Sequence, residues 1–157
     1  MGKIDDVLQP PQLEMLRKEY REQDAVQILS SGIPALDDRT AEYINSIRRA
    51  FYEGTAMEPE DRERCLIAVL ASRDAGLNLA IHIYLGLMEG LSPAEIADVV
   101  FLGGIYTGVD RISDGLAAEM KTLTVLAEVA TPPSSCAVAQ VMQALRDAFT
   151  SPPPPSR

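Results

Sequence analysis

The residue with the clearest chemical potential is His82, the only histidine in the chain. It lies in an almost continuous apolar run, residues 77–88, which predicts a helix buried in a protein core. At about 100° per residue, one narrow stripe of this helix carries Ala75, Asn78, His82, Gly86 and Glu89. Buried polar groups need partners, so the stripe must face another polar group or an internal cavity. Ala75 and Gly86 would leave space in front of the imidazole, which favours a site at this position.

Glu63 is the second candidate, on a predicted helix that begins near Pro59. Glu63 falls on the apolar side of that helix. A carboxylate there is either tolerated because it lies in the first turn, or exposed to solvent, or retained for a function. Arg62 and Arg64 flank it, and we interpret both as surface charges. A carboxylate beside an imidazole would fix the tautomer of the ring and favour its charged form. Together, His82 and Glu63 are suited to general acid–base catalysis.

The alternative interpretation of His82 is a core histidine with satisfied hydrogen bonds and no catalytic role. A metal site is disfavoured, because the chain has one histidine and no thiol at ligand spacing from it. Cys65 and Cys136 are far apart and form no C-x-x-C motif, which predicts two buried, reduced thiols.

The elements that must position these residues are all predicted to be helices. The chain shows no useful period-two alternation and no internal repeat, so we expect an all-α, single-domain bundle of about seven helices. The domain is expected over residues 12–150, after a flexible lead-in at 1–11 and before a Pro-rich disordered tail at 151–157. The expected helices cover residues 12–29, 38–53, 59–73, 77–89, 93–107, 112–130 and 138–149.

Two local signals bear on how these helices pack. Ser92, Pro93 and Glu95 form a capping box with proline at the first helical position, a strong helix start. The adjacent Gly103 and Gly104 lie inside the helix that follows, where each glycine costs about 1 kcal/mol relative to alanine. The pair therefore implies either close packing of another backbone or space kept for a ligand.

Composition limits the partners of the chain. Its 157 residues are 46% hydrophobic and 24% charged, which is typical of a globular domain with a sizeable core. A net charge of −9 argues against binding nucleic acid or anionic membranes. No apolar stretch is long enough to span a membrane and no leader segment opens the chain, so we expect a cytoplasmic protein.

From about Pro59 to Met120 the sequence resembles the carboxymuconolactone decarboxylase and AhpD-like family. The resemblance rests on the helix start with Glu63, the helix with His82, the G-L-S-P-A-E-I turn at residues 90–96, and residues 105–109. Redox members carry C-x-x-C-x-x-x-H, with a glutamate on the preceding helix. Counting back from His82 places the cysteine positions at Ala75 and Asn78, so both thiols are missing, whereas the glutamate position is occupied by Glu63.

The resemblance implies cofactor-independent decarboxylation of a small carboxylated lactone or a related cyclic acid, with His82 as proton donor and Glu63 as its orienting partner. Asn78, Ala75, Gly86 and Tyr106 would line the substrate site, with Tyr106 packed in its wall. An isomerase or cyclase on the same scaffold, or an accessory oligomer without catalysis, is the alternative. Family members assemble as trimers or hexamers, so a homo-oligomer is expected. Peroxidase activity is not expected, because it requires the missing thiols.

Overall fold

The computed structural model describes residues 4–24, 38–53, 56–73, 76–132 and 136–150. Within these ranges the chain is all-α, as predicted, and contains no strand. A short 3₁₀ helix, η1 (Ile4–Asp6), precedes seven α-helices. They are α1 (Pro10–Glu22), α3 (Asp38–Glu53), α4 (Pro59–Ala71), α5 (Gly76–Glu89), α6 (Pro93–Ile105), α7 (Val109–Val129) and α8 (Val138–Thr150).

The helix starts follow the sequence signals. Proline occupies the first turn of α1, α4 and α6, where its missing N–H leaves no intrahelical bond unmade. The capping box of α6 forms as predicted: the Glu95 N–H donates to Ser92 Oγ at 3.2 Å, and the Ser92 N–H donates to Glu95 Oε2 at 2.9 Å. The observed bounds of α3 are also those predicted from the sequence.

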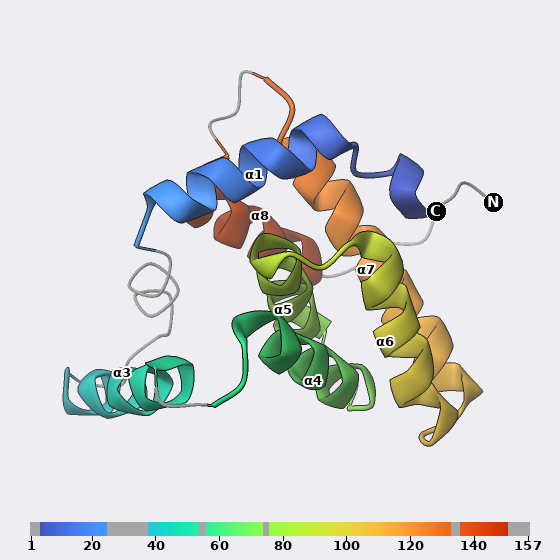
Figure 1. The fold of residues 1–157 in the computed structure, drawn as a ribbon, viewed down its shortest axis with the longest axis horizontal. Helices are drawn as coiled ribbons and strands as arrows, with labels where there is room; N and C mark the ends of the chain where they lie inside the picture. The colour runs from blue at the N-terminus through green and yellow to red at the C-terminus, as the bar shows by residue number, and fades with distance from the viewer. Residues whose placement is uncertain (1–3, 25–37, 54–55, 74–75, 133–135, 151–157) are drawn as a thin grey trace.

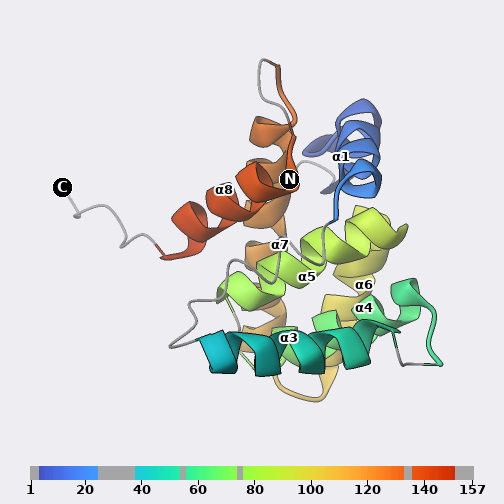
Figure 2. The ribbon, with the colours of Figure 1, turned by 90° about the vertical axis from the view of Figure 1, so that its left-hand side faces the viewer.

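Helix α5 is the centre of the bundle (Figure 1). It packs against α1, α4, α7 and α8, and α6 and α7 form a second pair beside it that also contacts α4. Helix α3 lies at the edge of the bundle in Figure 1 and on the side that faces the viewer in Figure 2. The central position of α5 explains its apolar sequence, because it must be covered on nearly every side.

The composition of the core confirms the prediction that α5 is a buried helix. Buried apolar residues from α1, α4, α6, α7 and α8, and from the segments that connect or precede helices, surround the α5 side chains. The α5 members are Leu79, Ala80, Ile83, Tyr84, Leu85, Leu87 and Met88. Leu8, which precedes α1, is also buried, and Pro10 already begins that helix. The boundary expected at residue 11 thus differs from the structure, in which Pro10 and Pro11 already belong to α1.

The predicted end of α1 needs correction, and some expectations concern residues outside the described ranges. Helix α1 ends at Glu22 and not near residue 29, because Gln23 adopts an extended conformation. The apolar residues 26–29 and the tail at 151–157 fall outside the described ranges. Cys136 is buried as predicted, whereas Cys65 is exposed on α4.

The glycine pair in α6 serves close packing. A Cβ on Gly103 would lie 3.1 Å from the backbone oxygen of Ala68 in α4. A Cβ on Gly104 would collide with Ile112 of α7, whose Cα would be only 3.2 Å away. Of the two alternatives, the structure therefore supports backbone packing, which holds α6 tightly between its two neighbours.

Candidate active site

Glu63 and His82 meet at the interface between α4 and α5. Oε2 of Glu63 lies 2.8 Å from Nδ1 of His82, which is hydrogen-bonding distance. The predicted hydrogen bond between the two side chains is therefore confirmed. The contact joins residues 19 positions apart on two helices, so it exists only when α4 and α5 pack in this register.

The two partners differ in their access to solvent. Glu63 is fully buried, with 0% of its surface exposed. It belongs to the second turn of α4 and not to the first. The side chain of His82 retains 21% of its surface accessible to solvent. The carboxylate is thus enclosed by protein while the imidazole reaches the surface, which allows the ring to exchange protons with a bound molecule or with water.

Arg62 lies beside the pair and is buried, with 6% of its surface exposed. Its Nε is 3.5 Å from Oε1 of Glu63, an ion-pair contact rather than a hydrogen bond. The interpretation of Arg62 as a surface charge is therefore wrong. Residues next to each other on a helix usually diverge, and sequence spacing gave no reason to expect this contact.

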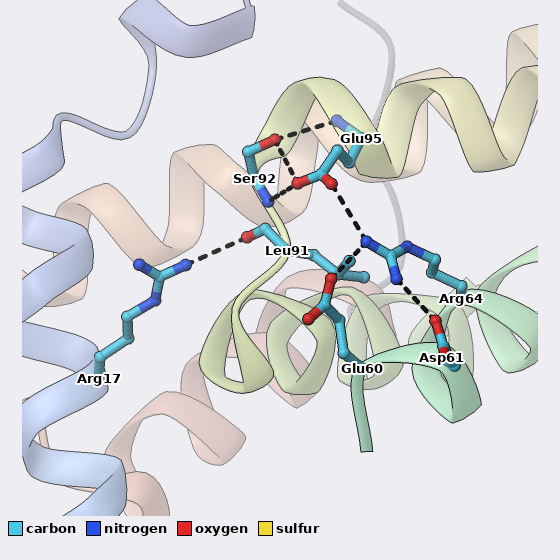
Figure 3. A network of polar contacts seen from close by, with 7 residues as sticks. All are labelled: Arg17, Glu60, Asp61, Arg64, Leu91, Ser92 and Glu95. Atoms are coloured by element: carbon cyan, nitrogen blue, oxygen red, sulfur yellow. Dashed lines mark hydrogen bonds and ion pairs between the residues drawn. The ribbon is translucent and has the colours of Figure 1, made fainter. Parts of the chain in front are cut away.

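Arg64 has a structural role in a network of polar contacts (Figure 3). Its guanidinium contacts Glu60 and Asp61 on α4 and reaches Glu95 at 3.1 Å on α6. Hydrogen bonds from the backbone and side chain of Ser92 lower the pKa of Glu95, so this carboxylate stays charged for Arg64. The network joins α4 to the start of α6.

Arg17 fixes the turn between α5 and α6 from the opposite side of that turn. Its guanidinium donates to the carbonyl oxygen of Leu87 at 2.8 Å. It also donates to the carbonyl oxygen of Leu91 at 3.2 Å, the contact drawn in Figure 3. Leu87 lies in the last turn of α5, where helical backbone acceptors lack intrahelical donors, and Leu91 lies in the turn that follows. The two arginines therefore help to fix the ends of the helices that carry the pair.

Gly86 has a different role from the one predicted. A Cβ at this position would lie 2.9 Å from Cδ1 of Leu91, 3.1 Å from Cδ1 of Ile67 and 3.7 Å from Cβ of Glu63. The volume in front of Gly86 is thus filled by side chains, and it does not form a cavity before the imidazole. The glycine instead lets α4 approach α5 closely enough for Glu63 to reach His82.

The other predicted lining residues are only partly placed by the structure. Asn78 is exposed, one turn before His82 on α5. Ala75 lies outside the described residues. Tyr106 caps the end of α6 with 93% of its surface exposed, so the expectation that it is packed in a pocket wall is wrong.

Two hollows on the described surface are lined by neither Glu63 nor His82. One is formed by α3 residues, and the other lies between α1 and the start of α6, around Leu13, Arg17 and Pro93. Met88 is packed in the core and Phe101 is half exposed, at 50%. Glu63 and His82 form a partly exposed site at the α4–α5 interface, because His82 keeps 21% of its side-chain surface accessible.

Glu119 of α7 is a buried titratable residue that the sequence analysis missed. It is 0% exposed, and neither carboxyl oxygen has a hydrogen-bond partner among the described residues. Burial raises its pKa to about 8. The adjacent Met120 is 37% exposed, although it is apolar. The spacing from Gly115 to Glu119 to Thr122, all buried, was the available signal.

Among the described residues, no group of three or more histidine, cysteine, aspartate or glutamate side chains is arranged to hold a metal ion. None of the described helices is long and apolar enough to cross a membrane.

Comparison with known proteins agrees with the resemblance seen in the sequence. The sequence pattern of the carboxymuconolactone decarboxylase family matches residues 34–119, more than half of the chain. The match includes α3, which precedes the region of resemblance at residues 59–120, and contains both Glu63 and His82. Neither curated proteins nor solved structures gave a significant match. The chain belongs to the carboxymuconolactone decarboxylase family.

Proposed function

We propose that this protein is a cofactor-independent acid–base enzyme that decarboxylates a small carboxylated lactone or a related cyclic acid. The observation that carries the proposal is the 2.8 Å contact between the buried carboxylate of Glu63 and Nδ1 of the partly exposed His82. An imidazole held at one nitrogen by a carboxylate can donate or accept a proton at the other.

The proposed reaction needs one proton and no electron acceptor. Cleavage of the bond to the carboxylate releases CO₂, and the electron pair left behind delocalises into the lactone carbonyl as a dienolate. His82 takes up a proton from solvent at Nε2 and donates it to the substrate's ring carbon, which returns the imidazole to its neutral form. Glu63 stabilises the charged imidazole and holds its orientation. The carboxylate is buried, so it is surrounded by protein rather than by water.

The residues at the redox positions support acid–base chemistry over peroxide reduction. Alanine and asparagine at positions 75 and 78 cannot attack a peroxide or resolve a sulfenic acid. Asn78, exposed one turn before His82, is proposed to hydrogen-bond a substrate oxygen. Ala75, on the same predicted stripe of the helix as His82, stays a proposed lining residue.

The experiment is a screen of purified protein against lactone acids and related cyclic acids for CO₂ release. Release must depend on His82, so His82→Ala is run beside the wild type with every acid. Release by the wild type alone supports the proposal. No release from any lactone acid, or equal release by the variant, would count against it.

A second candidate is an accessory homo-oligomer without catalysis. It is favoured by a group of exposed apolar side chains at the α6–α7 corner, namely Phe101, Leu102, Ile105, Tyr106 and Val109. Contiguous exposed apolar groups commonly mark a protein interface. A homo-oligomer, trimeric or hexameric, is proposed in either case, and the CO₂ screen distinguishes the enzyme from the accessory protein.

A further inference from the structure

We propose that Arg62 is a positioning residue that holds Glu63 as a carboxylate and thereby fixes His82 in the tautomer with its proton on Nδ1. The meaning of this arrangement for catalysis rests on the proposed function, but the arrangement itself is tested without any substrate.

The first step concerns the charge on Arg62. A guanidinium remains protonated in proteins, and burying it is unfavourable unless an anion lies close to it. Arg62 is 6% exposed, and Oε1 of the adjacent Glu63 lies 3.5 Å from its Nε. A fixed positive charge therefore stands beside a fully buried carboxyl group.

The second step concerns the carboxyl group. Burial by itself favours the neutral acid, whereas a nearby cation favours the carboxylate. The two oxygens of Glu63 are divided between partners: Oε1 faces Arg62, and Oε2 faces Nδ1 of His82. If Arg62 provides the compensating charge, Glu63 can remain ionised while His82 is neutral.

The third step links this ionisation to the imidazole. A carboxylate only accepts hydrogen bonds, so Nδ1 must then carry the proton, and Nε2 keeps a lone pair for proton transfer. If Glu63 were instead protonated, it would donate to Nδ1, and the ring proton would lie on Nε2. The tautomer of His82 thus reports the state of Glu63.

Arg64 provides a matched control on the same helix. Its charge is shared among Glu60, Asp61 and Glu95, and none of these contacts involves the pair (Figure 3). Replacing it removes one arginine from α4 without removing the cation beside Glu63. A change in tautomer that follows Arg62 but not Arg64 therefore reports the local ion pair.

The experiment is ¹⁵N NMR of the imidazole at neutral pH in full-length protein prepared without a polyhistidine tag. His82 is the only histidine, so its ring signals need no assignment by mutation. We expect a protonated Nδ1 and an unprotonated Nε2 in the wild type, in Arg62→Lys and in Arg64→Met. In Arg62→Gln, the two nitrogens should exchange their characteristic shifts as the proton moves to Nε2.

Retention of the Nδ1–H tautomer in a folded Arg62→Gln protein would overturn the proposal, as would an Nε2–H tautomer in the wild type. If Arg62→Gln does not fold, the ¹³C shift of the Glu63 carboxyl in the wild type decides: a carboxylate supports the proposal, and a protonated acid refutes it. A fixed Nδ1–H tautomer in a protein that releases no CO₂ would separate failure of the proposed function from failure of this inference.

Discussion

Glu63 on α4 and Gly86 on α5 lie against each other: a Cβ added to Gly86 would be 3.7 Å from Cβ of Glu63. This close approach brings the Glu63 carboxylate to the imidazole one turn earlier on α5. The absence of a side chain at position 86 is therefore a condition of the Glu63–His82 hydrogen bond, and it connects the packing of the core to the geometry of the site.

Gly86→Ala should lower stability and disturb the pair. The new methyl group must displace the ends of the Leu91 and Ile67 side chains, so we expect destabilisation of roughly 1–2 kcal/mol after the gain in helix propensity. Gly104→Ala should cost more, roughly 2–4 kcal/mol, because it meets the backbone of Ile112. Denaturant unfolding of both variants gives the comparison; a Gly86 variant less stable than the Gly104 variant would contradict this packing.

The burial of Glu119 predicts that the stability of the protein falls as the pH rises. Burial raises its folded-state pKa to about 8 from the ordinary value of 4.5. Between these values the folded protein retains a proton that the unfolded chain has released, so the free energy of unfolding decreases with pH, by roughly 3–5 kcal/mol at most.

Glu119→Gln should remove this dependence. Thermal unfolding from about pH 5 to about pH 9 should show the variant gaining on the wild type as pH increases. Glu128→Gln is the control, because Glu128 is exposed on the same helix. Parallel stability curves for wild type and Glu119→Gln would show that Glu119 does not retain its proton.

The two thiols should be chemically inequivalent and redox-inert toward peroxide. Cys65 is exposed, whereas Cys136 is buried and burial raises the pKa of its thiol. Mass spectrometry after alkylation of the native protein should therefore show one adduct, on Cys65, and a second only after unfolding. Peroxide turnover with a dithiol reductant, abolished by alkylating Cys65, would overturn the assignment of the site to acid–base chemistry.

Self-association is expected through the apolar α6–α7 corner. Light scattering at micromolar concentration should give a trimer or a multiple of it, and Tyr106→Glu combined with Val109→Glu should shift the mass toward the monomer. Both side chains are highly exposed in the single chain, so the charges should not disturb its core. Thr124→Glu, on the exposed side of α7, serves as the control. A monomeric wild type would contradict the expectation.

The sequence was sufficient for the fold class and for the two residues of the pair. The buried α5 followed from its apolar run, and α6 from its capping box, because both signals are local. The partner of His82 followed from the spacing of the family pattern. These features depend on neighbouring residues in the sequence or on a known helix register.

The remaining features depend on how helices pack in three dimensions. Burial of Arg62 and Glu119, and exposure of Tyr106, are set by which side of each helix its neighbours cover. Gly86 has the same small size whether it borders a cavity or a packed helix, so only the positions of Leu91 and Ile67 distinguish the two. Sequence periodicity does not fix the rotation of each helix about its own axis to within one residue.

The most direct test of the acid–base pair is turnover by wild type, His82→Ala and Glu63→Gln on a lactone acid from which the wild type releases CO₂. Loss of the proton donor should lower turnover by roughly a hundredfold or more in His82→Ala. Glu63→Gln should remain folded and also be impaired, because a neutral amide no longer stabilises the charged imidazole. An enzyme that decarboxylates at the wild-type rate with both substitutions would show that the pair is structural and that catalysis resides elsewhere.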